Sequence, residues 1–181
     1  MEVIKTNFEG LLIMQPKVFQ DDRGYFFEYF RKEVFEKFNF TFEFVQSNES
    51  KSNKDVLRGL HFQNPPYDQG KLVRVVKGGI RDVVLDIRLS SATFGRWFSC
   101  ELNEINKTIL WIPPGFAHGF LTLRDDTIFQ YECTNYYHKE SEGSIRWNDP
   151  TLNIDWKISN PIISEKDKIA PFFKNFVSRF N

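Results

Sequence analysis

The sequence lacks an excess of charge of either sign, since 24 Lys and Arg residues are balanced by 24 Asp and Glu residues. No global field would therefore attract nucleic acid or an anionic membrane, and any anionic ligand must be held by a local cluster of cations. The sequence also has no apolar run of the ~20 residues that a bilayer span requires. We predict a soluble, globular protein with no nucleic-acid or membrane partner.

Cysteine is scarce, with only Cys100 and Cys133 in the chain. Their spacing fits neither a zinc knuckle nor a redox motif. The apolar run at residues 11–14 has charged residues on both sides and is too short for a signal-peptide core. We therefore expect a cytoplasmic protein whose two thiols stay reduced.

Cofactor-binding motifs are missing as well. The chain has three histidines but no H-x-H pair, so a histidine-rich metal site would lack its ligands. It also has neither a glycine-rich dinucleotide loop nor a Walker lysine motif. We predict a function that uses no metal and no cofactor.

What the sequence does contain is a series of short β-rich runs separated by turn residues. These expected strands are residues 11–14, 24–30, 42–48, 71–78, 80–88, 96–102, 108–113, 119–123, 127–134 and 144–149. Helical patterns are confined to residues 31–39 and to a short turn that begins at Ser164, which is placed to cap the helix with Asp167. The 181 residues predict one all-β domain, a sandwich, jelly roll or barrel with a few short helices.

The segment "WIPPGFAHGF" contains Pro113, Gly115 and His118 in the spacing P-x-G-x-x-H. This spacing matches the second half of the cupin signature. The prolines and the glycine favour a tight turn between two strands, and the pleat of the following strand would aim His118 at the barrel interior.

A second polar cluster lies in "LRGLHFQNPPYDQGK", which holds Arg58, His61 and Lys71. His61 in isolation reads as a core imidazole bonded to a carbonyl, but Arg58 and Lys71 beside it would lower its pKa and keep it available as a base. In an ideal strand Arg58 and His61 point to opposite faces, so a bulge at Gly59 is required if both point inward.

Three other segments allow both a structural and a functional interpretation. Tyr131 shares a strand face with Phe129 and Cys133, where packing is the usual role of a tyrosine. Arg23 lies in a segment that reads as a surface hairpin, although its guanidinium group would also suit a diphosphate. His138 lies in a polar loop, and we expect it to be solvated.

Seven segments together, in their order and spacing, resemble the dTDP-4-dehydrorhamnose 3,5-epimerase family over nearly the whole chain. They are "LRGLHFQ", "QGKLVRVVKG", "DVVLDIRLSSATFGRW", "LWIPPGFAHGF", "NYY", "WNDPTLNIDW" and "SEKD". The resemblance implies a metal-free cupin jelly roll, a double-stranded β-helix that works as a homodimer whose N-terminal strands complete the partner's site. It also implies a nucleoside-diphosphate-linked 4-keto-6-deoxy sugar that is inverted at C3 and C5.

The resemblance also implies roles for individual residues. His61 would be the general base, Asp167 its orienting partner, Lys71 the cation near the C4 oxygen and Tyr131 the general acid. Tyr137 would stack on the nucleotide base, and Arg23 and Glu28 would come from the neighbouring subunit. The residues expected to contact the substrate are Arg23, Glu28, Gln46, Asn48, Arg58, His118, Tyr137, Glu142 and Lys166.

Elementary chemistry agrees with this interpretation, because a C4 ketone acidifies the hydrogens on C3 and C5. Epimerisation through an enolate needs a base on one face of the sugar, a cation at the oxygen and an acid on the opposite face. No coenzyme is required.

The sequence departs from the family at Ser47, where Q-D-N is common, and at Glu132, where a lysine commonly follows the tyrosine. The nucleotide base and the choice between hexose and heptose therefore stay open. So do two alternative functions. One is a C3-only epimerase or 3,4-ketoisomerase, and the other is a non-catalytic nucleotide-sugar binding protein.

Overall fold

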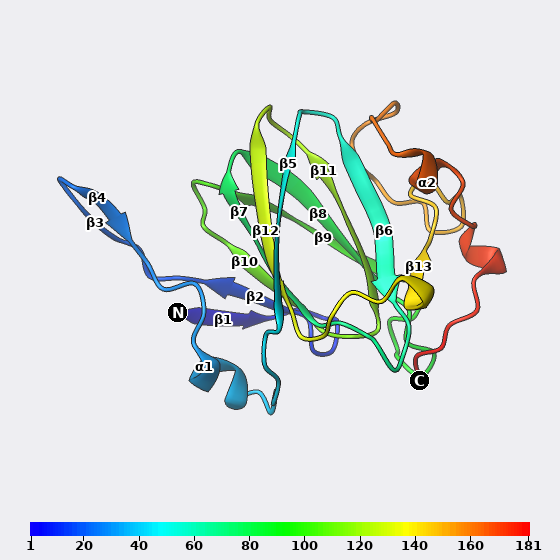
Figure 1. The fold of residues 1–181 in the computed structure, drawn as a ribbon, viewed down its shortest axis with the longest axis horizontal. Coiled ribbons are helices and arrows are strands. Elements are labelled where there is room, and N and C mark those ends of the chain that lie inside the picture. The colour runs from blue at the N-terminus through cyan, green and yellow to red at the C-terminus, as the bar shows by residue number, and fades with distance from the viewer.

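Two antiparallel β-sheets pack face to face in the computed structural model, which describes residues 1–181 (Figure 1). The six-stranded sheet has the order β1 (Glu2–Lys5), β2 (Leu12–Gln15), β10 (Ile109–Ile112), β7 (Lys71–Lys77), β12 (Thr127–Cys133) and β5 (Gln46–Ser52). The five-stranded sheet has the order β13 (Glu142–Ser144), β6 (Leu57–Gln63), β11 (Phe116–Thr122), β8 (Gly79–Asp86) and β9 (Trp97–Asn103). The predicted cupin-type jelly roll is confirmed.

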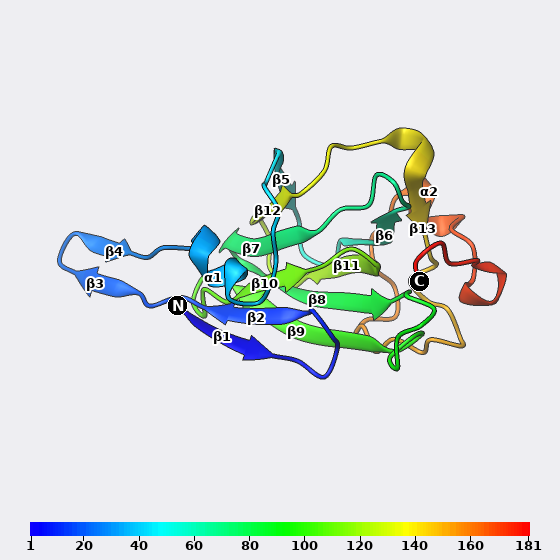
Figure 2. The same ribbon diagram turned by 90° about the horizontal axis from the view of Figure 1, so that it is seen from below.

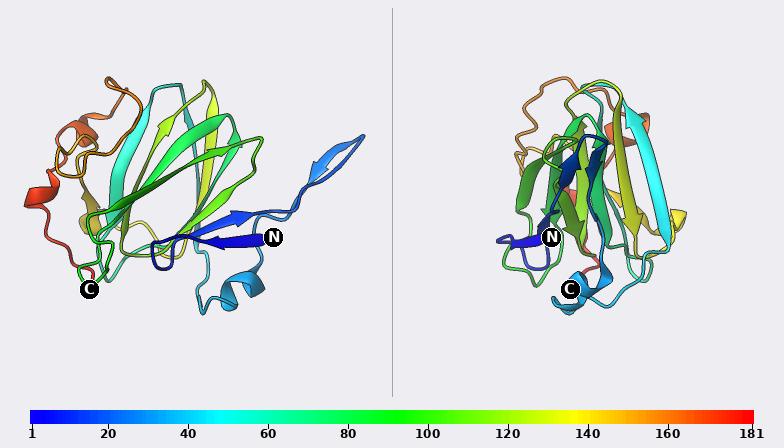
Figure 3. Two further views of the ribbon diagram at one scale, coloured as in Figure 1. Left: turned by 180° about the vertical axis from the view of Figure 1, so that it is seen from behind. Right: turned by 90° about the vertical axis from the view of Figure 1, so that its left-hand side faces the viewer.

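The remaining elements are short and lie outside the sandwich. A hairpin of β3 (Phe19–Asp21) and β4 (Gly24–Phe26) projects from the body on the side opposite the C-terminal segment (Figure 3). The helices are α1 (Lys32–Glu36) and α2 (Glu165–Lys168), with 3₁₀ turns η1 (Lys139–Ser141) and η2 (Phe173–Asn175). None of the helices has the length and apolar character needed to span a bilayer.

The space between the sheets is filled by strand residues that alternate inward and outward. Val73 and Phe129 face this interior from the six-stranded sheet, and Val84 and Phe120 face it from the five-stranded sheet. On β5 and β6, at the side of the sandwich closed by β13, polar side chains such as Ser50, Arg58 and His61 line an opening into the interior.

Each outer face has its own apolar cover. Trp111 on the outer face of the six-stranded sheet is stacked by Phe42, with ring centroids 4.3 Å apart, and packs edge-on against Phe35 of α1. The C-terminal segment covers the outer face of the five-stranded sheet with Trp156 and Phe180 (Figure 2). Both sheets that flank the open side of the sandwich are therefore held by apolar packing on their outer faces.

Several predicted boundaries are wrong. The strand expected at 42–48 begins only at Gln46, because the phenylalanines before it pack on Trp111 outside the sheet. The strand expected at 24–30 ends at Phe26, where the chain leaves the hairpin. The strand expected at 144–149 is instead β13, because Arg146 donates its backbone N–H to the carbonyl of Pro171 rather than to a strand. Strands β1 and β3 are not predicted by the sequence, since each has at most four residues and is largely exposed. Strand β6 is also absent from the expected ranges, although strand alternation was applied to Arg58 and His61 within it.

Other local predictions are confirmed. The chain is helical within 31–39, and Phe35 is its buried residue. Cys100 and Cys133 are both free thiols. Ser164 caps α2, since its Oγ accepts a hydrogen bond from the backbone N–H of Asp167 at 3.1 Å. This cap places Asp167 at the open edge of the sandwich.

Candidate active site

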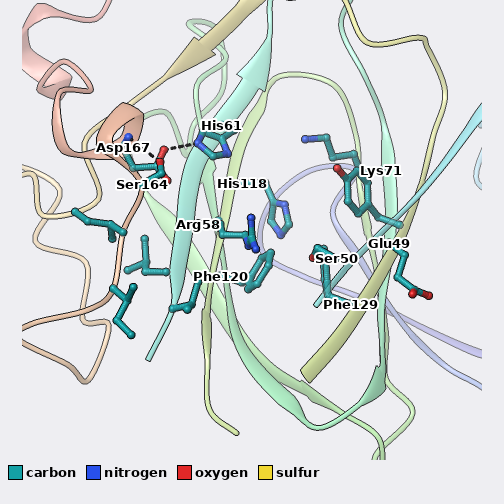
Figure 4. Close-up of a pocket in the computed structure, with 16 residues that line it drawn as sticks. Glu49, Ser50, Arg58, His61, Lys71, His118, Phe120, Phe129, Ser164 and Asp167 are labelled. Carbon is teal, nitrogen blue, oxygen red and sulfur yellow. Dashed lines mark hydrogen bonds and ion pairs between the residues drawn. The ribbon is translucent and has the colours of Figure 1, made fainter. Parts of the chain in front are cut away.

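A cavity of about 490 Å³, the larger cavity, lies at the open edge of the sandwich. It is lined by side chains from both sheets and from the segment before α2 (Figure 4). Its lining residues are Glu49, Ser50, Val56, Leu57, Arg58, His61, Lys71, His118, Gly119, Phe120, Phe129, Tyr131, Ile162, Ile163, Ser164 and Asp167. It is thus half apolar and half polar, as ligand sites usually are.

A second cavity of about 350 Å³, the smaller cavity, adjoins the first. Its lining residues are Gln46, Asn48, His61, Phe62, Gln63, Gln69, Lys71, Tyr131, Cys133, Tyr137 and Glu142. The two cavities share His61, Lys71 and Tyr131. These three residues, named from the sequence as base, cation and acid, therefore stand where the two cavities meet.

The side chains of Arg58 and His61 reach the same cavity because β6 carries a bulge. His61 pairs with His118 of β11, whereas Arg58 pairs with Phe120, so three steps on β6 match two steps on β11. The bulge at Gly59 predicted from the sequence is confirmed. Gly59 has φ of 134°, and a Cβ there would lie 2.5 Å from the Cα of Gly119, so only glycine fits.

His61 is held by a buried carboxylate. Its Nε2–H donates to Oδ1 of Asp167 at 2.6 Å, as Figure 4 shows, and the Asp167 side chain is 3% exposed. Burial raises the pKa of this carboxyl, but the hydrogen bonds from His61 and Ser164 outweigh burial and hold the pKa below its usual value. With the proton fixed on Nε2, the lone pair of the neutral ring lies on Nδ1.

Lys71 and Tyr131 lie side by side on neighbouring strands of the other sheet, with Nζ of Lys71 5.9 Å from the centre of the tyrosine ring. Burial lowers the pKa of the Lys71 ammonium, which Cys133, Glu142 and Asp82 partly oppose. Burial likewise raises the pKa of the Tyr131 phenol, so the phenol keeps its proton at neutral pH.

His118 forms a second imidazole–carboxylate pair. Its Nε2–H donates to Oδ2 of Asp82 at 2.8 Å, and Asp82 is fully buried with no hydrogen-bond partner for Oδ1. Asp82 is a site residue that was not predicted from the sequence. Alternation with Ile80 and Val84 places it at an inward position, but only the fold shows that its partner is His118.

The smaller cavity holds a hydrogen-bonded group of predicted substrate-binding residues. The backbone N–H of Tyr137 donates to Oε1 of Gln46 at 2.9 Å, and its hydroxyl donates to Glu142 at 3.0 Å. Lys166 forms an ion pair with Glu142. Nε2 of Gln46 donates to Oδ1 of Asn48 at 3.0 Å. The structure therefore brings these five residues together.

Arg23 and Glu28 are the two predicted site residues that lie away from both cavities. Arg23 is paired with Asp21 on the projecting hairpin, and Glu28 is paired with Arg31 just after it. Neither lines a cavity with His61. Their contribution to a neighbouring subunit stays a prediction.

The arrangement is suited to proton transfer at carbon. An imidazole with its lone pair on Nδ1, an ammonium group and a protonated phenol surround one space, and the two imidazoles are each backed by a buried carboxylate. A carbon acid held there can lose a proton to the imidazole while the ammonium stabilises the oxyanion that forms.

Comparison with known proteins supports this chemistry. The family profile described as dTDP-4-dehydrorhamnose 3,5-epimerase matches residues 5–175. The dTDP-4-dehydrorhamnose 3,5-epimerase of Shigella flexneri is 53% identical over 92% of this chain and 93% of its own. The Legionella pneumophila dTDP-6-deoxy-D-glucose-3,5-epimerase, solved in complex with dTDP-4-keto-L-rhamnose, superposes with a TM-score of 0.93 at 44% identity, over 99% of this chain and 98% of its own.

A relative with a narrower reaction also matches. The 3'-monoepimerase of Streptomyces bikiniensis, solved in complex with dTDP-quinovose, has a TM-score of 0.88 at 34% identity and covers 92% of this chain and 85% of its own. The same scaffold therefore occurs in single and in double epimerases.

Proposed function

The chain belongs to the dTDP-4-dehydrorhamnose 3,5-epimerase family, and we propose that it inverts C3 and C5 of dTDP-4-dehydro-6-deoxy-D-glucose to give dTDP-4-dehydro-L-rhamnose. It is an isomerase that acts on a nucleoside-diphosphate sugar. The observation that carries the proposal is the meeting of His61, Lys71 and Tyr131 at the junction of two cavities.

In the proposed reaction, Nδ1 of His61 removes the proton from C3, releases it to solvent and, in a second round, removes the proton from C5. Asp167 holds the imidazole in the required tautomer and stabilises the imidazolium that forms. Each proton loss leaves an enolate on the C4 oxygen, beside the Lys71 ammonium.

Tyr131 then returns a proton to the opposite face of the carbon. Because burial keeps the phenol protonated at neutral pH, it is ready to donate, and solvent restores its proton between turnovers. Arg58 and His118 bind the sugar in the larger cavity. The smaller cavity takes the diphosphate and the nucleoside, with Tyr137 stacked on the base and Gln46, Asn48, Glu142 and Lys166 around it.

We also propose that two copies form a homodimer through the β3–β4 hairpin. In the single chain the hairpin exposes Tyr25 by 56% and Phe26 by 69%. Neighbouring exposed aromatic side chains of this kind are typical of a surface that a second protein chain covers. Insertion of the hairpin into a neighbouring copy would bring Arg23 and Glu28 to its nucleotide. The cytoplasmic location and the absence of a nucleic-acid or membrane partner stay predictions.

Solvent exchange tests the reaction directly. Incubation with dTDP-4-dehydro-6-deoxy-D-glucose in D₂O is expected to introduce deuterium at both C3 and C5, observed by NMR. Uptake at C3 alone would replace the proposal with a single epimerase like that of Streptomyces bikiniensis. A non-catalytic binder would bind dTDP without any exchange.

The role of His61 has its own test. The His61→Ala variant is expected to lose exchange by at least ~10³-fold, while its affinity for dTDP stays within ~3-fold of the parent. The reason is that the His61 imidazole contacts the sugar and not the nucleotide. Unchanged exchange would remove His61 from its proposed role.

A further inference from the structure

Gln63 is a buried polar residue that the proposed reaction does not use. It lies two residues after His61 on β6 and is 5% exposed. Its side-chain amide is fully bonded to backbone groups. Nε2 donates to the carbonyl of Tyr67 and, at 3.1 Å, to the carbonyl of Tyr136, while Oε1 accepts from the N–H of His138 at 2.8 Å.

The three bonded groups belong to two loops, residues 64–70 and 134–141. Further contacts join the same loops. The backbone N–H of Asn64 donates to the carbonyl of Ser141 at 2.8 Å, and the rings of Tyr67 and His138 stack with centroids 3.7 Å apart. His138 is therefore not the freely solvated residue that the sequence predicts. The amide of Gln63 lies where the two loops meet β6.

The residue enclosed by these bonds is Tyr137. Gln63 holds the backbone of the residue before it and of the residue after it, whereas Gln46 holds its own N–H and Glu142 holds its hydroxyl. The ring faces of Tyr137 stay open, and the residue is 55% exposed at the smaller cavity.

We propose that Gln63 is a positioning residue that holds Tyr137 in the conformation that receives the nucleoside base. This inference rests on the proposed function, in which Tyr137 stacks on that base. A tyrosine presented on a rigid backbone loses less conformational freedom on binding than one on a mobile loop, so the fixed loop raises affinity for the nucleotide. Because His61 and Gln63 share β6, one strand sets both the reacting end and the nucleoside end of the site.

The test is the Gln63→Met variant, which keeps the volume but removes the amide. The carbonyls of Tyr67 and Tyr136 and the N–H of His138 then lose their partners, and the loop is free to move. We expect the dissociation constant for dTDP, measured by calorimetry, and KM to rise by about 10-fold. We expect kcat to change by less than ~3-fold, because the groups at the sugar are untouched.

Gln15→Met is the matched control. Gln15 also donates its amide to a backbone carbonyl, that of Asn106 at 2.6 Å, and accepts from Thr108, but it lines neither cavity. Its loss is expected to lower thermal stability while the affinity for dTDP and both kinetic constants stay unchanged. This variant separates a general loss of stability from an effect on the nucleoside end.

A double-mutant cycle with Tyr137→Ala identifies the route of the effect. If Gln63 acts by positioning Tyr137, the Gln63→Met change alters dTDP affinity by less than ~2-fold once the tyrosine ring is gone. An effect of full size in the Tyr137→Ala background, or a fall in kcat as large as the rise in KM, would overturn the proposal.

Two further outcomes are distinguishable. If the parent protein neither binds dTDP nor exchanges deuterium, the proposed function itself has failed. If Gln63→Met does not fold, Gln63→Glu takes its place, because it keeps the acceptor for His138 and removes the donors for Tyr67 and Tyr136. It is expected to weaken dTDP binding by about 10-fold, and unchanged binding would overturn the inference.

Discussion

His61 and His118 lie directly opposite each other on the neighbouring strands β6 and β11, and each donates its Nε2–H to a different buried carboxylate. The two imidazoles therefore form a pair at the wall of the larger cavity. Asp167 reaches His61 from the C-terminal segment, whereas Asp82 reaches His118 from β8 within the same sheet.

This pairing predicts that Asp82 positions His118. Asp82→Asn removes the charge that fixes the tautomer of His118, so kcat is expected to fall by about 10- to 100-fold with little change in dTDP affinity. Asp86→Asn is the control, because Asp86 is an equally buried carboxylate on β8 that binds Arg88 and lines neither cavity. Equal activity losses in the two variants would assign Asp82 a purely structural role.

Tyr131→Phe separates proton removal from proton return. The variant keeps His61 and Lys71, so deuterium exchange on the base side is expected to persist. Formation of the inverted product, followed by NMR, is expected to fall by about 10²- to 10⁴-fold, the usual contribution of a general acid. Tyr29→Phe, on the outer face against Arg74, serves as the control. Full product formation by Tyr131→Phe would point to another acid.

Lys71→Met is expected to stabilise the fold while it removes activity. Burial lowers the pKa of Lys71, which means that the folded state holds the ammonium at a free-energy cost below the ordinary lysine pKa. Replacement by an apolar side chain should raise the free energy of unfolding by about 1 kcal/mol and slow exchange by about 10²- to 10³-fold. Urea denaturation at pH 7 measures the free energy of unfolding, with the exposed Lys77→Met as control.

The Asp167–His61 contact predicts how stability depends on pH. The pKa of Asp167 lies below its ordinary 3.8, so the ionised carboxylate stabilises the fold above pH 3.8. That contribution is lost as the pH falls through the lowered pKa of the folded state. The gap in unfolding free energy between the parent and Asp167→Asn should therefore be widest near pH 7 and narrow below pH 3.8. A gap of constant size would contradict the linkage.

The exposed hairpin predicts the assembly. Phe26→Asp places a charge where the proposed dimer buries an aromatic ring, so the variant is expected to shift toward monomer in sedimentation experiments. KM should also rise, because Arg23 and Glu28 would no longer reach a neighbouring site. Val177→Asp, at a side chain that is 82% exposed outside the hairpin, is the control. A dimer of unchanged stability in Phe26→Asp would place the interface elsewhere.

Sequence pattern predicted the strands well where alternation is strong, as in β7, β8 and β12. It failed at residues 42–45, where Phe42 and Phe44 alternate as in a strand but pack on Trp111 outside the sheet. A period of two reports that one side of the chain is buried. It does not report whether the backbone pairs with a neighbouring strand.

Some features of the candidate site could likewise be predicted from the sequence, and others could not. The bulge at Gly59 was predictable, because Arg58 and His61 can share a side only if one residue is inserted between them. Asp82 and Gln63 were missed, because a buried polar side chain is explained only by the partner that it meets. Those partners, His118 and the two loops, come from distant parts of the chain.

The sequence by itself determined the chemistry that is available, since an imidazole, an ammonium and a phenol have their reactivity before the chain folds. The tertiary structure alone decided that Asp167, 106 residues along the chain from His61, orients that ring, and that Lys71 faces it from the opposite sheet. These spatial contacts between residues far apart in the sequence follow from how the two sheets pack, and that packing depends on the whole chain.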